Sequence, residues 1–513
     1  MSNPITDNLF HLIKALEKSE KRFFKLYVTR NSSAEDSKII QLFDALDRMD
    51  KYQDELLFKK CPKIKREHLP NVKLLLYKKI LTCLRLLRIN DNIETQLNEQ
   101  MDYARILFDK GLYLQSLRVL EKLKDIAKNN NQLTYVFQAL HFEKHIESLY
   151  ITRSFEERAD ILAREGEEIS NTLKRAEKLS SLSLQLYSFY IKNGFSRNIK
   201  ESNAFKAFFE SRLPSIEGGT LGFYDKLFLY QSFTWFAFIR QDFLMFYRYS
   251  LKGADLFEQN PEMIIHETSH FIKSMHNLLS AHFILRNTSK FTAVLEKFET
   301  FAISPHFKKN ENIRIQTFAY LNVAKINKHF IEGTFNEGVE MIPTVEERLL
   351  SFSSRIDRHR ILIFYYKFAC LHFGNGNNKK AIYYLNKIIQ WKVDLRTDLQ
   401  CYARLLSLLA HFELGNYDLL EYLLKSIYRF MAKMKNLSLL EKEIFSFIRK
   451  SFDLSIPEIK QAFIELKSNL DIHKTNPYET RSYMYLDIIS WLESKIKGVP
   501  VAEIIREKYL KQK

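Results

Sequence analysis

The chain has 513 residues and a formal net charge of +17 at pH 7. It contains only 13 glycines and 10 prolines, whereas average usage of these two residues is roughly 12%. A large β-sandwich, a propeller, a long disordered region or an enzyme built on glycine-rich nucleotide loops would need more turn residues. With 46% hydrophobic and 27% charged residues, the sequence predicts a folded, soluble, all-α protein.

Cysteine usage and the N-terminus indicate a reducing compartment. The four cysteines are scattered singly, so neither a disulfide framework nor a thiolate zinc site is expected. The first residues, MSNPITDNLFHLIK, lack the basic start, continuous apolar run and cleavage site of a secretory signal. The most apolar stretch, 227–239, is too short to span a bilayer. We therefore expect a cytoplasmic protein that does not interact with membranes.

The first 95 residues are predicted to form a basic helical region. Between Lys59 and Arg88 ten lysines and arginines stand against one acid, Glu67. A helix over 66–89 would bury a narrow apolar stripe, with basic residues on the opposite arc. The residues of that arc are Lys73, Lys78, Arg85 and Arg88.

This basic arc has three interpretations. The ordinary one is a solvated, lysine-rich helix face. Because a shorter helix over 52–60 precedes it, the segment also imitates a helix-turn-helix that could bind nucleic acid, including ribosomal RNA, through phosphates. No glycine marks the turn and no pattern of base-reading side chains is present. An acidic protein partner is the third possibility.

From residue 96 to 440 the apolar residues recur at helical spacing, and a glycine-centred pattern repeats four times. In each copy a glycine ends one helix, and the residue two positions later starts the next helix. A mostly small residue stands five positions after the glycine, and an aliphatic residue stands nine positions after it. Glycine supplies the left-handed backbone that stops a helix, and a small residue lets two helices approach closely. The four copies begin at Gly111, Gly333, Gly376 and Gly415.

Weaker copies without glycine fall near Gln241 and Ser289. Together these positions predict helical hairpins of about forty residues. The best copy, which contains Tyr365, Phe368, Ala369, His372, Gly376, Ala381 and Leu385, resembles a tetratricopeptide repeat, although His372 replaces the usual tyrosine. The resemblance implies a right-handed α-solenoid over 96–440 that binds a protein or peptide in its concave groove.

The last segment, 441–513, is predicted to contain helices without the glycine pattern. Solenoids need atypical terminal repeats that cover their exposed ends, so the simplest interpretation of this segment is a C-terminal helical cap. The domains expected from the sequence are therefore a basic region over 1–95, repeats over 96–440 and a cap over 441–513.

One string has the spacing of a catalytic motif. His266, Glu267 and His270 form HExxH, in which two histidines on one helix face bind zinc and the glutamate polarises its water. His276 stands where a third ligand could follow, but Lys273 replaces the glycine that would let the chain leave the helix, and Glu296 or Glu299 on the next helix is the alternative third ligand. The two histidines of the motif are expected on a solvated polar face with Lys273, and we expect no stoichiometric zinc.

Twelve aromatic residues cluster in 223–249. Aromatic and basic residues together can stack on nucleic-acid bases, but the helical spacing here favours a packed hairpin interior. No phosphate-binding loop or nucleophile motif is recognisable. The sequence therefore predicts a non-catalytic protein–protein interaction scaffold with no cofactor and no enclosed pocket, with a nucleic-acid-associated regulator and a zinc metallopeptidase as alternatives.

Overall fold

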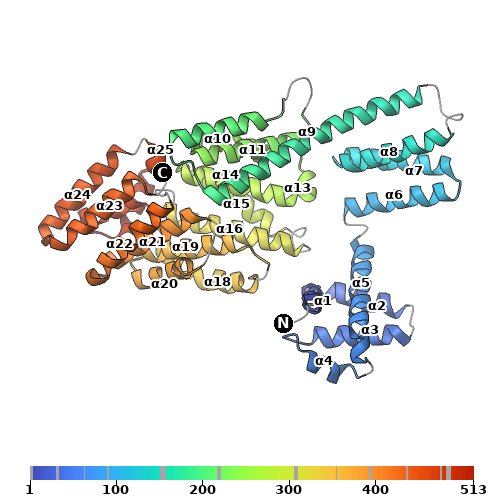
Figure 1. Cartoon of the computed structure of the whole chain (residues 1–513), viewed down its shortest axis with the longest axis horizontal. Helices are drawn as coiled ribbons and strands as arrows, with labels where there is room; N and C mark the ends of the chain where they lie inside the picture. Colours follow the sequence, from blue (N-terminus) through green and yellow to red (C-terminus); the bar gives the residue numbers. More distant parts are fainter. Residues whose placement is uncertain are drawn as a thin grey trace. The chain divides into compact units, whose positions relative to one another are not determined.

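Figure 1 shows a computed structural model of the chain. It describes residues 4–30, 34–62, 64–88, 92–150, 157–215, 221–304, 310–353, 355–391, 396–434, 437–473, 476–480 and 487–512. Most of these residues are helical and none lies in a strand, so the all-α prediction is confirmed. Within these ranges, no helix combines the length and the apolar character that crossing a bilayer requires. The chain divides into two compact units, unit 1 (Met1–Ser170) and unit 2 (Asn171–Lys513).

Unit 1 consists of the N-terminal helices. They are α1 (Pro4–Ala15), α2 (Lys18–Thr29), α3 (Ala34–Asp47), α4 (Asp54–Lys60), η1 (Arg66–His68), α5 (Leu69–Arg88), α6 (Ile93–Asp109), α7 (Tyr113–Asn129), α8 (Leu133–Tyr150) and the start of α9 (Arg158–Asn193). Helices α1 to α5 enclose one apolar core, and α6, α7, α8 and the start of α9 enclose another. The buried Lys124 of α7 pairs at 2.7 Å with Glu143 of α8 and at 3.5 Å with Glu165 of α9.

Unit 2 contains the rest of α9 and the helices after it. They are α10 (Ile199–Arg212), α11 (Phe223–Arg240), α12 (Phe243–Gln259), α13 (Met263–His266), α14 (Thr268–Ile284), α15 (Thr288–Ala302), α16 (Glu311–Glu332), α17 (Phe335–Glu340), α18 (Ile342–Ser351), α19 (Arg358–Gly374), α20 (Asn378–Ile389), α21 (Thr397–Glu413), α22 (Tyr417–Lys433), α23 (Leu439–Lys450), η4 (Ser451–Asp453), α24 (Ile456–Ile472), α25 (Pro477–Thr480), α26 (Ile488–Lys497) and α27 (Val501–Gln512). Consecutive helices pack as pairs, notably α11 with α12, α19 with α20 and α21 with α22.

The turns of these pairs have the backbone that the sequence predicts. Gly111, Gly333, Gly376 and Gly415 all have φ between +69° and +77°, the left-handed region that is open to glycine at low cost. In all four copies the second helix begins two residues after the glycine, as at Tyr113 in α7. The positions five and nine residues after each glycine are buried.

The two weaker copies behave differently from one another. Gln241 itself adopts the left-handed conformation, with φ +62°, and α12 starts two residues later at Phe243. Near Ser289 the left-handed residue is instead Arg286, with φ +56°, and α15 already begins at Thr288. The turn therefore lies three residues earlier than the pattern predicted, because Phe291, which matched the helix start, packs inside α15.

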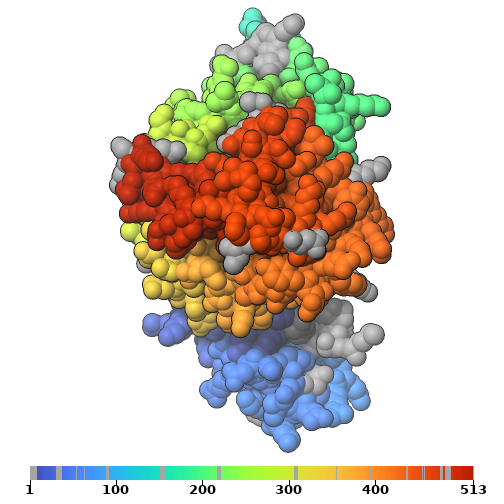
Figure 2. All heavy atoms as spheres, turned by 90° about the vertical axis from the view of Figure 1, so that its left-hand side faces the viewer, coloured from blue at the N-terminus to red at the C-terminus, as the bar shows by residue number. Residues whose placement is uncertain are grey.

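The residues after 440 share the main core of unit 2 with earlier helices. Ile488, Trp491, Leu492 and Ile505 belong to the same apolar cluster as residues of α16, α19 and α21. Helix α27 packs against α16, and Arg506 Nη1 donates to the Glu332 carbonyl oxygen at 3.3 Å. In Figure 2 the red C-terminal residues lie between the green residues and the gold and orange ones of this unit.

Two hairpin glycines provide a matched test of this C-terminal packing. Gly333 and Gly376 have nearly the same φ, but a Cβ at Gly333 would lie 2.7 Å from the Ala502 oxygen and 2.8 Å from the Arg506 nitrogen, whereas a Cβ at Gly376 meets nothing within 4 Å. G376A should cost about 1–2 kcal/mol for a left-handed alanine. G333A should cost at least about 1 kcal/mol more, because α27 must move.

Denaturant unfolding of the two variants measures this difference. Equal losses in the free energy of unfolding would contradict the close approach of α27 to the turn at Gly333.

Candidate binding pocket in unit 2

The HExxH string does not lie on one helix. Helix α13 ends at His266, and Glu267 has φ −117° and ψ 42°, so α14 starts a new helix at Thr268. The break removes the i, i+4 relation on one face that a zinc-binding pair needs. Among the described residues there is no group of three or more histidine, cysteine or acidic side chains that could hold a metal ion.

The side chains of this string make other contacts. Glu267 accepts a hydrogen bond from the Tyr224 hydroxyl at 2.6 Å, and His270 Nδ1 lies 2.9 Å from Gln231 Nε2. The prediction that His270 and Lys273 stand on a solvated face is wrong, because both are half-buried. Burial lowers the pKa of His270 to about 4 and that of Lys273 to about 8. The alternative third ligand Glu299 pairs with Lys325 at 2.9 Å.

The basic arc of α5 is only partly exposed. Lys78 and Arg85 are exposed, as predicted. Lys73 is 5% exposed, and it donates to the Tyr52 hydroxyl with its Nζ 4.6 Å from the Tyr52 ring centroid. The prediction that Lys73 is available to a partner is therefore wrong. The side chain of Arg88 lies outside the described residues.

Three of the twelve aromatic residues in 223–249 are core residues, and the other nine are half-buried. Phe223, Phe236 and Phe246 are buried in three apolar clusters. Phe233 stacks on Tyr249 with ring centroids 4.4 Å apart. These contacts bear out the prediction of a packed hairpin interior.

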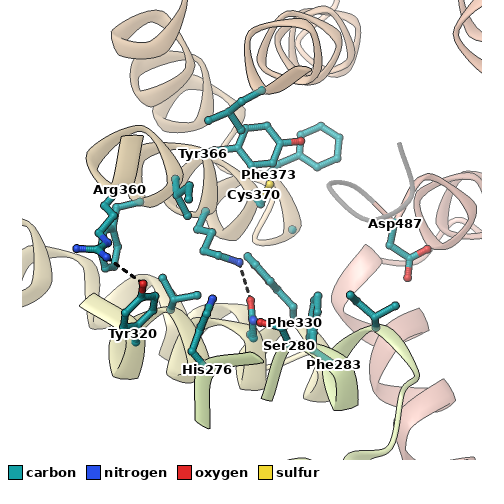
Figure 3. A pocket seen from close by; sticks show the side chains of 18 of the residues that line it. His276, Ser280, Phe283, Tyr320, Phe330, Arg360, Tyr366, Cys370, Phe373 and Asp487 are labelled. Carbon is teal, nitrogen blue, oxygen red and sulfur yellow. Dashed lines mark hydrogen bonds between the residues drawn. The ribbon is translucent and has the colours of Figure 1, made fainter. Parts of the chain in front are cut away.

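Unit 2 contains a partly open pocket of about 280 Å³ between its helices. Helices α14, α16 and α19 supply most of the wall, and Trp491 of α26 and Ile505 of α27 close one side. Figure 3 shows His276 and Tyr320 pointing toward the space below Arg360, with Asp487 across from them. The C-terminal segment is therefore part of the wall of this partly open pocket.

Helical periodicity explains which residues reach the pocket. Along α16 the lining residues Tyr320, Val323, Asn327 and Phe330 recur every three or four positions, which places them on one face of a helix. On α19 the same spacing holds from Arg360 through Lys367 to Cys370. The opposite faces of both helices carry core residues such as Phe318 and Phe368.

Two of the cations in the wall are neutralised by carboxylates. Arg396 donates twice to Asp398, at 2.8 and 3.0 Å, and its guanidinium lies 5.0 Å from the Tyr190 ring centroid. Arg286 Nη2 lies 3.3 Å from Asp487 Oδ2, which ties the turn before α15 to the start of α26. These pairs hold the wall together and leave little charge for a ligand.

Arg360 is held mainly by a tyrosine. Its Nη2 donates to the Tyr320 hydroxyl at 2.9 Å (Figure 3), and its Nε lies 3.3 Å from the half-exposed carboxylate of Asp357. The negative Asp357 and the Tyr320 hydroxyl together outweigh desolvation, so the pKa of Arg360 is raised. Arg360 is therefore a fixed positive charge at one end of the pocket.

Lys367 is the unusual group of the pocket. Its Nζ donates to Asn327 Oδ1 at 2.6 Å and lies 5.3 and 5.9 Å from the ring centroids of Phe330 and Phe283. No carboxylate among the described residues pairs with it. Burial lowers its pKa to about 8, because an apolar environment disfavours the ammonium.

The other titratable groups near Lys367 stay neutral at physiological pH. Burial, aided by the positive Arg360 and Lys367, lowers the pKa of His276 to about 3. Burial raises the pKa of Cys370 to about 12 and that of Tyr366 well above its ordinary value. The pocket thus combines aromatic walls with a positive charge that has no counter-charge.

The sequence contains a signal for this site that the motif search missed. Within the strongly apolar run 361–371 of α19, Lys367 is the only charged residue. A lysine in the middle of a largely buried helix costs stability unless its charge is paired. The pocket itself could not be derived, because its wall joins residues of α14, α16, α19 and α26 that only the tertiary fold brings together.

Two comparisons with known proteins found no match. No protein-family model matches the chain. A search of curated proteins finds no significant match either.

The desolvated Lys367 predicts a pH-dependent stability. In the unfolded chain its pKa returns from about 8 toward 10.5, so between these values the unfolded chain binds more protons than the native protein. The free energy of unfolding should therefore rise with pH across this window relative to K367M, by up to about 3 kcal/mol. Below pH 8 K367M should be the more stable protein.

Chemical denaturation of wild type and K367M at pH 7 to 10.5 tests this difference. The control K379M removes an exposed lysine of α20 and should show no such gain. A constant difference between wild type and K367M over the whole range would contradict the desolvation of Lys367.

Proposed function

We propose that this protein is a non-catalytic scaffold that holds a segment of a protein partner in the hollow of unit 2. The observation that carries the proposal is the unpaired Lys367 inside an aromatic-lined pocket. An uncompensated ammonium in such a place destabilises the empty protein, and an anionic partner would relieve that cost.

The helical-hairpin pattern supports the same proposal. Paired helices with left-handed turns at Gly333, Gly376 and Gly415 are the feature in which the chain resembles tetratricopeptide repeats, whose first helices line a peptide-binding surface. In this chain α14, α16 and α19, the first helices of their pairs, line the pocket. The analogy concerns architecture, and the binding function remains our proposal.

Site-specific photo-crosslinking tests whether the hollow holds a partner. A photoreactive phenylalanine analogue would replace Val323, which lines the pocket, or Tyr422 of α22, which is 70% exposed. After irradiation in a native lysate, we expect a defined protein segment crosslinked from position 323 and not from position 422. Crosslinks from position 422 alone would overturn the proposal.

A basic surface of unit 1 favours a second candidate function, binding of nucleic acid. Besides Lys78 and Arg85, four cations at the end of α4 and around η1 are exposed, and none of the six pairs with a described carboxylate. These four are Lys59, Lys60, Lys65 and Arg66. Exposed cations without a carboxylate partner are the electrostatic feature that phosphate backbones recognise.

Salt-dependent binding of a single-stranded RNA tests the second candidate. K78E/R85E should weaken binding and lower the slope of log affinity against log salt by about 1.4, because two phosphate contacts to a single strand are lost. The double variant R118E/K122E changes two exposed residues of α7 in the same unit and matches the change in net charge. Equal effects of the two double variants would show that only net charge matters.

A further inference from the structure

The anion anchor of the pocket consists of two neighbouring groups. Lys367 uses one of its three donors on Asn327 Oδ1, at 2.6 Å. Asn327 is 5% exposed, and its amide nitrogen has no hydrogen-bond partner among the described residues. Both residues line the pocket. The ammonium of α19 and the amide of α16 therefore offer adjacent donors to a single ligand group.

The residues around Lys367 limit the charge that a bound ligand group can carry. Phe283 and Phe330 flank the Lys367 ammonium, and Phe373 and Trp491 continue the apolar wall. Arg286 and Arg396 are already neutralised by Asp487 and Asp398. One positive charge near Asn327 thus remains without a counter-charge, which balances a monoanion better than a dianionic phosphate.

Arg360 does not belong to the same anchor. It precedes Lys367 by seven residues on α19, which is two helical turns or about 10 Å along the axis, and Tyr320 and Asp357 hold its guanidinium. A single carboxylate cannot span that distance. Arg360 marks the polar end of the pocket, and the aromatic residues beside Lys367 mark the apolar end.

We propose that the pocket binds a carboxylate attached to an apolar body, with the carboxylate between Lys367 Nζ and Asn327 Nδ2 and the body against the phenylalanine rings. A planar carboxylate has two acceptor oxygens, one for each donor. The proposal rests on the function proposed above and specifies the chemistry that the hollow recognises. A free organic acid and the C-terminus of a partner chain both carry this chemistry.

Calorimetric titration of the full-length protein separates the charge from the apolar body. 3-Phenylpropionate should bind with one-to-one stoichiometry, and 3-phenylpropan-1-ol, which lacks the charge, should bind at least tenfold more weakly. K367M should lower the affinity for the acid at least tenfold and leave that for the alcohol within twofold. K379M, which alters an exposed lysine, should bind both as the wild type does.

A second variant places the counter-charge in the protein itself. Asn327→Asp puts a carboxylate beside Lys367, so it should raise the melting temperature and abolish binding of the acid. A higher melting temperature would show that the loss of binding does not come from misfolding, since a misfolded variant would be less stable than the wild type. Equal binding of acid and alcohol, unchanged binding of the acid to K367M or N327D, or no binding of the acid to the wild type would overturn the proposal.

Two peptides distinguish the sources of the carboxylate. A short peptide ending in phenylalanine is titrated with a free C-terminus and as the C-terminal amide. Binding of the free-acid peptide alone supports a chain end as the ligand, whereas binding of 3-phenylpropionate without either peptide supports a free organic acid. In the latter case the carboxylate site stands and the scaffold function fails. Crosslinks from position 323 without binding of any carboxylate would support the scaffold function and overturn the carboxylate site.

Discussion

The architecture depends on reversing the chain between paired helices within very few residues. With so little glycine and proline, many reversals rely on one left-handed residue, as at Gly333, Gly376 and Gly415. Because these turns are short, the second helix packs directly on the first, and the free face of the first helix is left for other contacts. In unit 2 the free faces of α14, α16 and α19 meet around one pocket.

One side of the pocket wall comes from the C-terminal helices of the chain. Helices α26 and α27 share the main core with α16, α19 and α21, and Gly333 allows α27 to approach the turn after α16. One glycine thereby serves two purposes, since it reverses the chain and leaves room for a distant helix. A terminal segment that only covered an exposed end would not contribute to the pocket wall.

Two lysines illustrate how differently the protein surrounds an ammonium group. Lys124 in unit 1 is as inaccessible as a core residue, but it pairs with Glu143 and Glu165, which also pair with Arg158 and Lys128. Lys367 has only the neutral Asn327 and two phenylalanine rings. Lys124 thus has carboxylate partners within the protein, whereas under the function proposed above an anionic ligand would supply the partner of Lys367.

The sequence by itself determined the helical class, the left-handed glycine turns, the helix starts two residues later and the aromatic core of α11 and α12. These features are local or periodic, so neighbouring residues decide them. Only the tertiary structure decided that Lys73 is buried under Tyr52, that the helix breaks at Glu267, and that Lys367 and Asn327 meet inside a pocket closed by α26 and α27. These outcomes depend on contacts between residues far apart in the chain, which periodicity along one helix does not contain.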